Sequence, residues 1–376
     1  MTTQTNYAWV YVGTYTGRAA HIKSQMQSAG FYVYQLNLTT GELTHTSTLT
    51  GLINPSYLAI EPQKRYLYAV SETEEMAGKQ SGGVSACAID PENGALTLIN
   101  SQLTQGKAPC HLSVDHSGQY VLSANYSSGS ICILPILADG RLGESSDFIQ
   151  HEGSSINKQR QEGPHAHSIN VDKDNRYAFV ADLGIDKMMS YQLDLEAGKL
   201  VPNCPPWVEI KPGAGPRHFA FSPDSQYAYL INELDSTLIT FAYDAGSGRL
   251  QELQTLSTLP EGLDPAQDIQ GGMNHCADIH VSPSGKFVYG SNRGHDSIAI
   301  FQVEPENGKI SPIGHEPTQG KTPRNFALDP TGAFLLVANQ DTDTIVTFRI
   351  EQKTGQLYPT GHITTVPTPV CIKMIL

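Results

Sequence analysis

Short runs of alternating hydrophobic and polar residues fill the chain, and they recur in a fixed order. One repeated unit alternates through a first segment, turns, and continues from an aromatic residue into a second alternating segment. Strict alternation is typical of half-buried strands, so each unit predicts a hairpin whose aromatic residue anchors the core. The unit occurs six times. In each copy the first segment begins at the first residue named and the second segment begins at the aromatic residue: Pro55 and Tyr66, Pro109 and Tyr120, Ala166 and Tyr177, Pro216 and Tyr227, Cys276 and Phe287, and Pro323 and Phe334.

A second unit follows the first: an alternating run, an acidic or polar turn, a glycine, and another alternating run. Its turns include Asp-Pro-Glu-Asn-Gly at 90–94 and Glu-Pro-Glu-Asn-Gly at 304–308, which favour short hairpins. Together the two units give four antiparallel strands about every 50 residues, which is the pattern of a propeller blade. The glycines of its seven copies are Gly41, Gly94, Gly140, Gly198, Gly248, Gly308 and Gly355.

The two ends of the chain supply complementary halves of one further blade. Residues 9–14 resemble a second strand without a preceding first strand, and residues 369–372 resemble a first strand without a second. Pairing them would close the ring and remove the exposed strand edges of an open array. The sequence therefore predicts an all-β, seven-bladed propeller, formed by residues 1–376 as a single domain. Its C-terminal strand is expected to pair with the N-terminal three strands.

One face of this propeller is expected to carry the function. If the strands of a blade are called A to D from the axis outward, the A–B and C–D turns are short. The long connections, at 16–30, 72–82, 145–163 and 257–274, all emerge at the other end, and variable loops on a rigid scaffold often carry binding residues. The positions of the strands place at this mouth of the channel Tyr15, Glu72, His111, His167, Arg217, His218, Glu233, Arg293 and Arg324.

The amino-acid composition limits the classes of molecule that the protein is expected to bind. The chain has 24 Lys and Arg against 37 Asp and Glu, a formal net charge of −13, which argues against nucleic acid. Arginines gathered in an acidic protein favour a small anionic substrate instead. No apolar run approaches the ~20 residues of a membrane span. Six scattered cysteines and a start without a secretory signal pattern predict a cytoplasmic protein with reduced thiols. The sequence does not indicate whether the protein binds other proteins.

Several candidate residues also have purely structural interpretations. Arg217 and Glu233 could form a structural ion pair, and His111 and His218 could be packed channel histidines. His165 and His167 would share a strand face and could bind a metal, but a third ligand is missing from the pattern. The chain has no dinucleotide-binding fingerprint and no Gly-x-Ser-x-Gly nucleophile motif. We therefore expect neither a metal nor a cofactor.

Five segments in order resemble the seven-bladed lactonase family, which includes propeller-type 6-phosphogluconolactonases and carboxy-muconate cyclases. They are Gly-Pro-His-Ala-His at 163–167, Ala-Asp-Leu-Gly at 181–184, Gly-Pro-Arg-His at 215–218, Asn-Glu-Leu at 232–234 and Ser-Asn-Arg-Gly at 291–294. Val-Gly-Thr-Tyr-Thr at 12–16 resembles the opening of that family. The resemblance implies a metal-independent site on His167 or His165, with Arg217, Glu233 and Arg293.

The sequence thus predicts a lactonase that hydrolyses a sugar-acid lactone, in first place 6-phosphogluconolactone of the pentose phosphate pathway. Glu233 or His167 would be the general base, Arg217 the electrophilic partner, and Arg293 with Arg324 the clamp for the anion. His165, His111, His218, Tyr15 and Glu72 would complete the binding of the substrate. The alternatives are a carboxy-muconate lactonising cyclase and a propeller that only binds other proteins.

Overall fold

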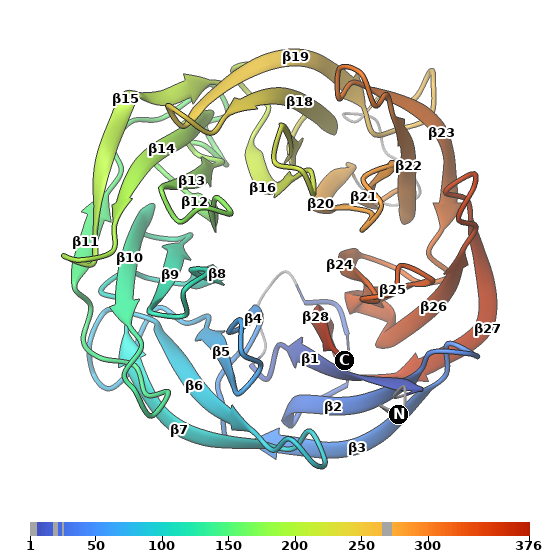
Figure 1. The fold of residues 1–376 in the computed structure, drawn as a ribbon, viewed down its shortest axis with the longest axis horizontal. Helices are drawn as coiled ribbons and strands as arrows, with labels where there is room; N and C mark the ends of the chain where they lie inside the picture. The colour runs from blue at the N-terminus through green and yellow to red at the C-terminus, as the bar shows by residue number, and fades with distance from the viewer. Residues whose placement is uncertain (1–5, 18–21, 25, 265–272) are drawn as a thin grey trace.

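The computed structural model describes residues 6–17, 22–24, 26–264 and 273–376. Within these residues the chain forms seven four-stranded antiparallel sheets around a central axis, as Figure 1 shows. The predicted seven-bladed propeller is confirmed. Parts of two loops that the sequence places at the functional mouth, residues 18–21, 25 and 265–272, lie outside the described residues.

Blades 1 to 6 each run outward from strand A to strand D in chain order. Blade 1 contains β4 (Leu58–Ile60), β5 (Tyr66–Ser71), β6 (Gly83–Ile89) and β7 (Leu96–Leu103). Blade 2 contains β8 (Pro109–Val114), β9 (Tyr120–Asn125), β10 (Ser130–Pro135) and β11 (Asp147–Gln150). Blade 3 contains β12 (Ala166–Val171), β13 (Tyr177–Asp182), β14 (Lys187–Asp194) and β15 (Lys199–Glu209).

The remaining blades continue around the ring. Blade 4 contains β16 (Pro216–Phe221), β17 (Tyr227–Asn232), β18 (Thr237–Asp244) and β19 (Arg249–Ser257). Blade 5 contains β20 (His275–Val281), β21 (Phe287–Arg293), β22 (Ser297–Val303) and β23 (Ile310–Pro317). Blade 6 contains β24 (Pro323–Leu328), β25 (Phe334–Asn339), β26 (Thr344–Ile350) and β27 (Leu357–Thr365), with the 3-10 helix η1 (Gln340–Thr342) between its second and third strands.

Blade 7 joins the two ends of the chain, as the sequence predicts. Its sheet has the order β28-β1-β2-β3, made of β28 (Pro369–Ile375), β1 (Tyr7–Thr14), β2 (Gly30–Asn37) and β3 (Leu43–Thr50). The register pairs Trp9 with Ile375 and Gly13 with Cys371. In Figure 1 the C-terminal strand lies next to the axis, beside the first strand of the chain.

The two sequence repeats meet at the contacts between neighbouring blades. In every blade the glycine of the C–D turn lies against an aromatic side chain of strand B of the preceding blade, which is the first residue of that strand except for Trp9, the third residue of β1. These aromatic residues therefore pack between two neighbouring blades as well as anchoring the core. The pairs are Trp9 with Gly94, Tyr66 with Gly140, Tyr120 with Gly198, Tyr177 with Gly248, Tyr227 with Gly308, Phe287 with Gly355, and Phe334 with Gly41.

A β-bulge near the start of the A strand recurs in most blades. In blade 3, for example, Ala166 pairs with Asp182 and Ser168 with Ala181, so His167 is the extra residue. A bulge turns one side chain out of the regular alternation, and here it does so beside the channel. The same shift makes Cys110, Arg217 and Arg324 the extra residues of their strands.

Candidate functional site

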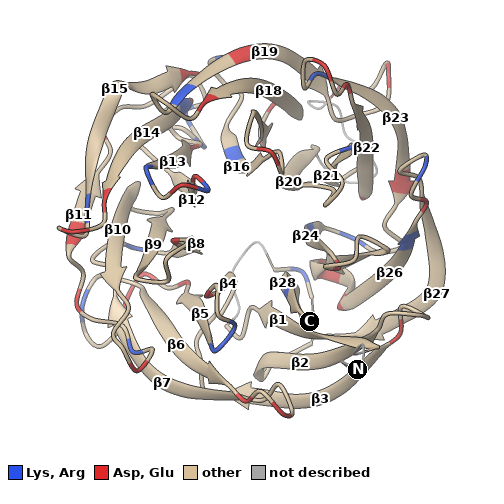
Figure 2. Ribbon diagram, in the orientation of Figure 1, with Lys and Arg blue, Asp and Glu red and all other residues tan. Residues whose placement is uncertain are grey.

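A cleft of about 530 Å³ opens at the end of the axis where A strands begin and B strands end. It lies on the face that the sequence assigned to function. In Figure 2 most charged segments lie on turns and outer strands, whereas a basic segment of β16 faces the central channel. The lining residues are Tyr15, Asn54, Glu72, Thr73, Glu74, Ala108, Cys110, Tyr126, Ser127, Arg160, His167, Glu233, His275, Arg293 and Arg324.

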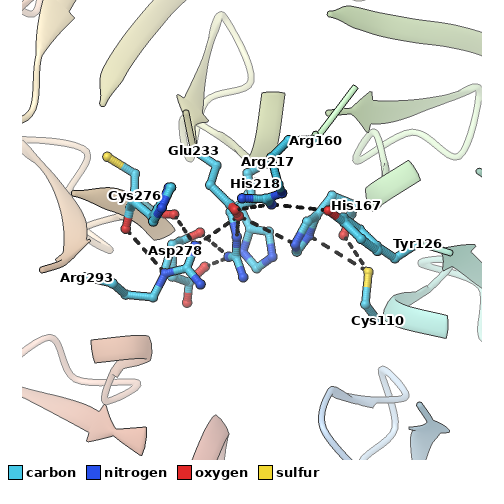
Figure 3. A network of polar contacts seen from close by, with 12 residues as sticks. Cys110, Tyr126, Arg160, His167, Arg217, His218, Glu233, Cys276, Asp278 and Arg293 are labelled. Atoms are coloured by element: carbon cyan, nitrogen blue, oxygen red, sulfur yellow. Dashed lines mark hydrogen bonds and ion pairs between the residues drawn. The ribbon is translucent and has the colours of Figure 1, made fainter. Parts of the chain in front are cut away.

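Glu233, directly after β17, is the centre of a charged cluster (Figure 3). Its Oε2 atom lies 2.8 Å from Arg217 Nε and 2.9 Å from Arg293 Nη2. Its Oε1 atom lies 2.6 Å from Arg160 Nη2. Burial raises the pKa of this carboxyl, but Arg293, Arg160 and Arg217 together hold it well below its usual range. The group is therefore a carboxylate throughout the physiological range, and the three cations weaken it as a base.

His167 lies against this cluster with a neutral imidazole. Its Nε2 atom is 4.0 Å from Glu233 Oε2, and its ring meets the Tyr126 ring edge-on at 5.5 Å. Burial, followed by the positive charge of Arg217, lowers the pKa of His167 well below its usual value. A neutral imidazole can accept a proton, and the carboxylate of Glu233 would then stabilise the imidazolium.

The opposite wall of the cleft carries a second set of polar groups. The Tyr15 hydroxyl donates to Glu72 Oε2 at 2.9 Å, and the Ser56 hydroxyl also donates to this carboxylate. The guanidinium of Arg324 lies over the Tyr15 ring, 5.5 Å from its centre. Among the described residues Arg324 forms no ion pair, in contrast to Arg160, Arg217 and Arg293. This wall thus offers a cation to an anionic ligand.

The structure brings together most of the residues that the sequence selected. His167, Arg217, Glu233 and Arg293 form one cluster, and Tyr15, Glu72 and Arg324 face it. Arg217 lies deepest of the arginines, with 2% of its side chain exposed and its Nη1 on the Ala277 carbonyl.

Three predicted histidines lie outside the cleft. His218 and His111 form a lower layer of the channel, where His218 borders a narrower cavity and His111 Nδ1 receives the Ile169 amide at 3.3 Å. His165 stacks on Tyr126 at 4.6 Å and contacts Glu162. The bulge at His167 interrupts the alternation that would have aligned it with His165, and no cluster of three His, Cys, Asp or Glu side chains in the described ranges could hold a metal.

Arg160 is the site residue that the sequence reasoning missed. It lies in the loop between β11 and β12, donates to the Tyr126 hydroxyl at 3.2 Å, and keeps 34% of its side chain exposed at the rim. Periodicity places strand residues but says nothing about where a long loop folds. The available signal was a basic residue in a long loop of the predicted functional face.

Comparisons with known proteins cover nearly the whole chain. The family model described as "Lactonase, 7-bladed beta-propeller" matches residues 9–374. The 6-phosphogluconolactonase of Bacillus subtilis (strain 168) is 37% identical over 369 residues, which are 97% of either chain. The 6-phosphogluconolactonase of Formosa agariphila is 37% identical over 85% of this chain and 86% of its own. The solved structure of a periplasmic gluconolactonase of Pseudomonas aeruginosa superposes with a TM-score of 0.89, at 32% identity over 98% of this chain and 99% of its own.

Proposed function

The chain belongs to the seven-bladed β-propeller lactonase family, and we propose that it hydrolyses a sugar-acid lactone, 6-phosphogluconolactone, to 6-phosphogluconate. The observation that carries this proposal is a neutral histidine beside a buried carboxylate in a cleft lined by arginines. Lactone hydrolysis needs a group that takes a proton from water and a cation where charge develops on the carbonyl oxygen. The cluster around Glu233 contains both.

His167 is the proposed general base. Of the two candidates from the sequence, Glu233 is held by three guanidinium groups, which lower its pKa, whereas His167 is neutral and lines the cleft. Glu233 then has a different role: it fixes the arginines and stabilises the imidazolium that forms on His167. One water proton passes through His167 to the ring oxygen as the ester bond breaks.

Arg293 is the proposed electrophilic partner in place of Arg217. It lines the cleft, whereas Arg217 lies beneath it, bound to Glu233 and to the Ala277 carbonyl. Burial lowers the pKa of Arg293 to about 10, which leaves the guanidinium charged at neutral pH. A charged donor at the carbonyl oxygen stabilises the tetrahedral intermediate.

Arg324 and Arg160 are the proposed ligands of the phosphate. Both line the same cleft, Arg324 over the Tyr15 ring and Arg160 at the rim beside Glu233. Arginine matches the oxygens of a phosphate through two parallel hydrogen bonds. With its carbonyl at Arg293, the lactone would extend its phosphate across the cleft toward Arg324, and Arg160 would bind a phosphate oxygen from the rim.

A panel of lactones tests the function. We expect the purified protein to give its highest kcat/KM with 6-phosphogluconolactone, above the spontaneous rate, and to keep it after exhaustive treatment with a chelator. Glu233→Gln should lower kcat at least about 10²-fold. The exposed Glu209→Gln should not lower it, and it serves as the matched control. Turnover of a muconolactone alone would favour the cyclase, and no turnover at all would favour a binding platform.

We also propose a cytoplasmic location. All six cysteines are free thiols, and five of them are buried, which suits a reducing compartment. The described residues contain no helix long and apolar enough to cross a membrane. Cell fractionation checks the location directly, and a periplasmic pool like that named for the Pseudomonas aeruginosa relative would contradict it.

A further inference from the structure

A second layer of polar side chains lies below the cleft along the axis. His218 Nδ1 is 2.7 Å from Asp278 Oδ1, and the other carboxylate oxygen of Asp278 is 3.0 Å from His280 Nε2. Asn325 donates to the same oxygen. The side chains of His218 and Asp278 are only 6% and 3% exposed, and they lie next to the Glu233 cluster in Figure 3. No step of the reaction described above uses them.

The contact between His218 Nδ1 and the Asp278 carboxylate determines which nitrogen of His218 carries the proton. Burial raises the pKa of Asp278, but His280 and His218 hold it well below its usual range, so the group is a carboxylate. A carboxylate on Nδ1 fixes the tautomer with the proton on that nitrogen. Nε2 is then an acceptor, and no described residue forms a hydrogen bond with it.

A narrow cavity connects this histidine to the site. It is lined by both His167 and His218, and it shares Tyr15, Glu72, Cys110, His167 and Arg324 with the cleft above. Its volume is about 10 Å³, and a site of that size, with polar groups around it, fits one water molecule. The two imidazoles also touch, edge to face, with ring centres 5.3 Å apart.

In lactone hydrolysis at neutral pH, both protons of the attacking water must be transferred to other groups. The water oxygen bonds to the carbonyl carbon, the bond from that carbon to the ring oxygen breaks, and one proton ends on the ring oxygen. The product acid is ionised, because a carboxylic acid has a pKa near 4. The second proton therefore ends in solvent, either from the free product acid or through a second acceptor in the site that removes it before the product leaves.

We propose that His218 is this second proton acceptor and that Asp278 is its positioning residue. His218 Nε2 takes the second proton through the water in the narrow cavity and releases it to solvent through the cleft. Asp278 holds the required tautomer and stabilises the imidazolium while it exists, without becoming protonated. The inference rests on the proposed lactonase activity.

The titratable groups around His218 lie on β8, β12, β16, β20 and β28, and one lies just before β4. Burial and then Arg217 lower the pKa of His218 to about 4, while Asp278 acts in the opposite direction. Loss of the Asp278 carboxylate should therefore lower this pKa further and make the imidazole a weaker base. The other titratable groups that face it are His111, His167, Tyr57 and Lys373.

Two substitutions test the pair. In His218→Asn the new amide can still donate to Asp278 from the place of Nδ1, but the acceptor at Nε2 is gone. We expect kcat for 6-phosphogluconolactone at pH 7 to fall at least about tenfold, with KM and the thermal midpoint little changed. In Asp278→Asn we expect a similar fall in kcat, and the acid limb of the profile of kcat against pH should move to lower pH. A merely structural role would move that limb to higher pH, because the weakened fold would unfold earlier in acid.

A control and an independent signal complete the experiment. His116→Gln, which replaces an exposed histidine on the turn between β8 and β9, should leave kcat and the acid limb unchanged. Nitrogen-15 NMR of the wild type should show His218 with its proton on Nδ1, and Asp278→Asn should lose that preference. Wild-type kcat in His218→Asn would overturn the inference and leave the lactonase proposal standing. A wild-type protein that turns over no lactone would overturn both.

Discussion

Glu233 illustrates how neighbours decide what a single residue does. From the sequence it was one of two candidates for the base, and its expected neighbour was one arginine. Three guanidinium groups surround the carboxylate, two of them on one oxygen. Removing one member of a buried ion pair leaves an uncompensated charge, at a cost of about 3–5 kcal/mol. Glu233→Gln is thus expected to cost stability as well as activity.

Arg324 gives the sharpest test at this scale, because it forms no ion pair among the described residues and borders the cleft. Arg324→Gln should lower kcat/KM for 6-phosphogluconolactone about tenfold or more, since a charged hydrogen bond contributes about 1.5–3 kcal/mol. The kcat/KM for gluconolactone, which lacks the phosphate, should stay within about twofold, and the unfolding free energy should change little. Steady-state kinetics on both lactones separate the outcomes. Equal losses on the two substrates would assign Arg324 to the reaction centre instead of the phosphate.

At the scale of strands and turns, two small irregularities position the site and the ring. The bulge of strand A directs His167, Arg217 and Arg324 toward the channel. The glycine of each C–D turn accepts an aromatic ring from the preceding blade. Because the bulge and the glycine contact recur around the ring, neighbouring blades pack in the same relative orientation. The residues at the channel mouth of several blades therefore line one cleft.

Gly248→Ala tests the contact between blades. Gly248 has a φ of 67°, and an added Cβ atom would lie 2.3 Å from the Tyr177 ring. We expect urea unfolding to show a loss of about 2–4 kcal/mol, from the backbone conformation and the overpacking together. Gly361→Ala is the matched control, because its φ is 85° and nothing lies within 4 Å of the added atom. If both variants lose the same free energy, the aromatic contact contributes nothing.

At the scale of the whole molecule, the ring depends on the pairing of its two ends. β28 pairs with β1 and also contacts β24, β25 and β4 of the neighbouring blades. In the closed ring every sheet packs between two neighbouring sheets and only short strand edges remain at the axis, so the seven sheets support one another. Loss of one inner strand should then affect blades on both sides.

Deletion of residues 369–376 is the corresponding experiment. We expect a large drop in the thermal midpoint and faster hydrogen exchange in all blades, because β28 seals the apolar contacts of blades 1 and 6 as well as its own. A synthetic peptide of residues 366–376, added in trans, should restore part of the midpoint. Faster exchange confined to blade 7 would show that the blades are stable independently of closure.

The channel histidines predict how stability depends on pH. Burial lowers the pKa of His111, His167 and His218 in the folded protein, whereas the unfolded chain binds protons near the ordinary value of about 6.5. Their contribution is therefore complete above that pH and is lost as the pH falls below it, by up to about 1.4 kcal/mol per pH unit for each histidine. Urea unfolding at pH 7, 6 and 5 should show the decline, and His111→Gln should reduce its slope. A constant unfolding free energy over this range would contradict the buried, neutral state.

The sequence by itself determined the architecture of this protein. Alternation of period two, turn residues and a repeat of about 50 residues are local properties, and they fix strands, blades and the pairing of residues 9–14 with 369–372 before any packing is known. They also place Arg217, Glu233, Arg293 and Arg324 at one mouth of the channel, because an A strand and the end of its B strand return to the same face.

Only the tertiary structure decided how these residues are used. The bulge at His167, the path of the loop that carries Arg160, and the contact of Asp278 with His218 are not periodic, so spacing could not reveal them. Whether an ionisable group acts as a base, an anchor or a binding residue depends on its burial and on the charges within a few ångströms. Those neighbours come from different blades and meet only when the ring closes.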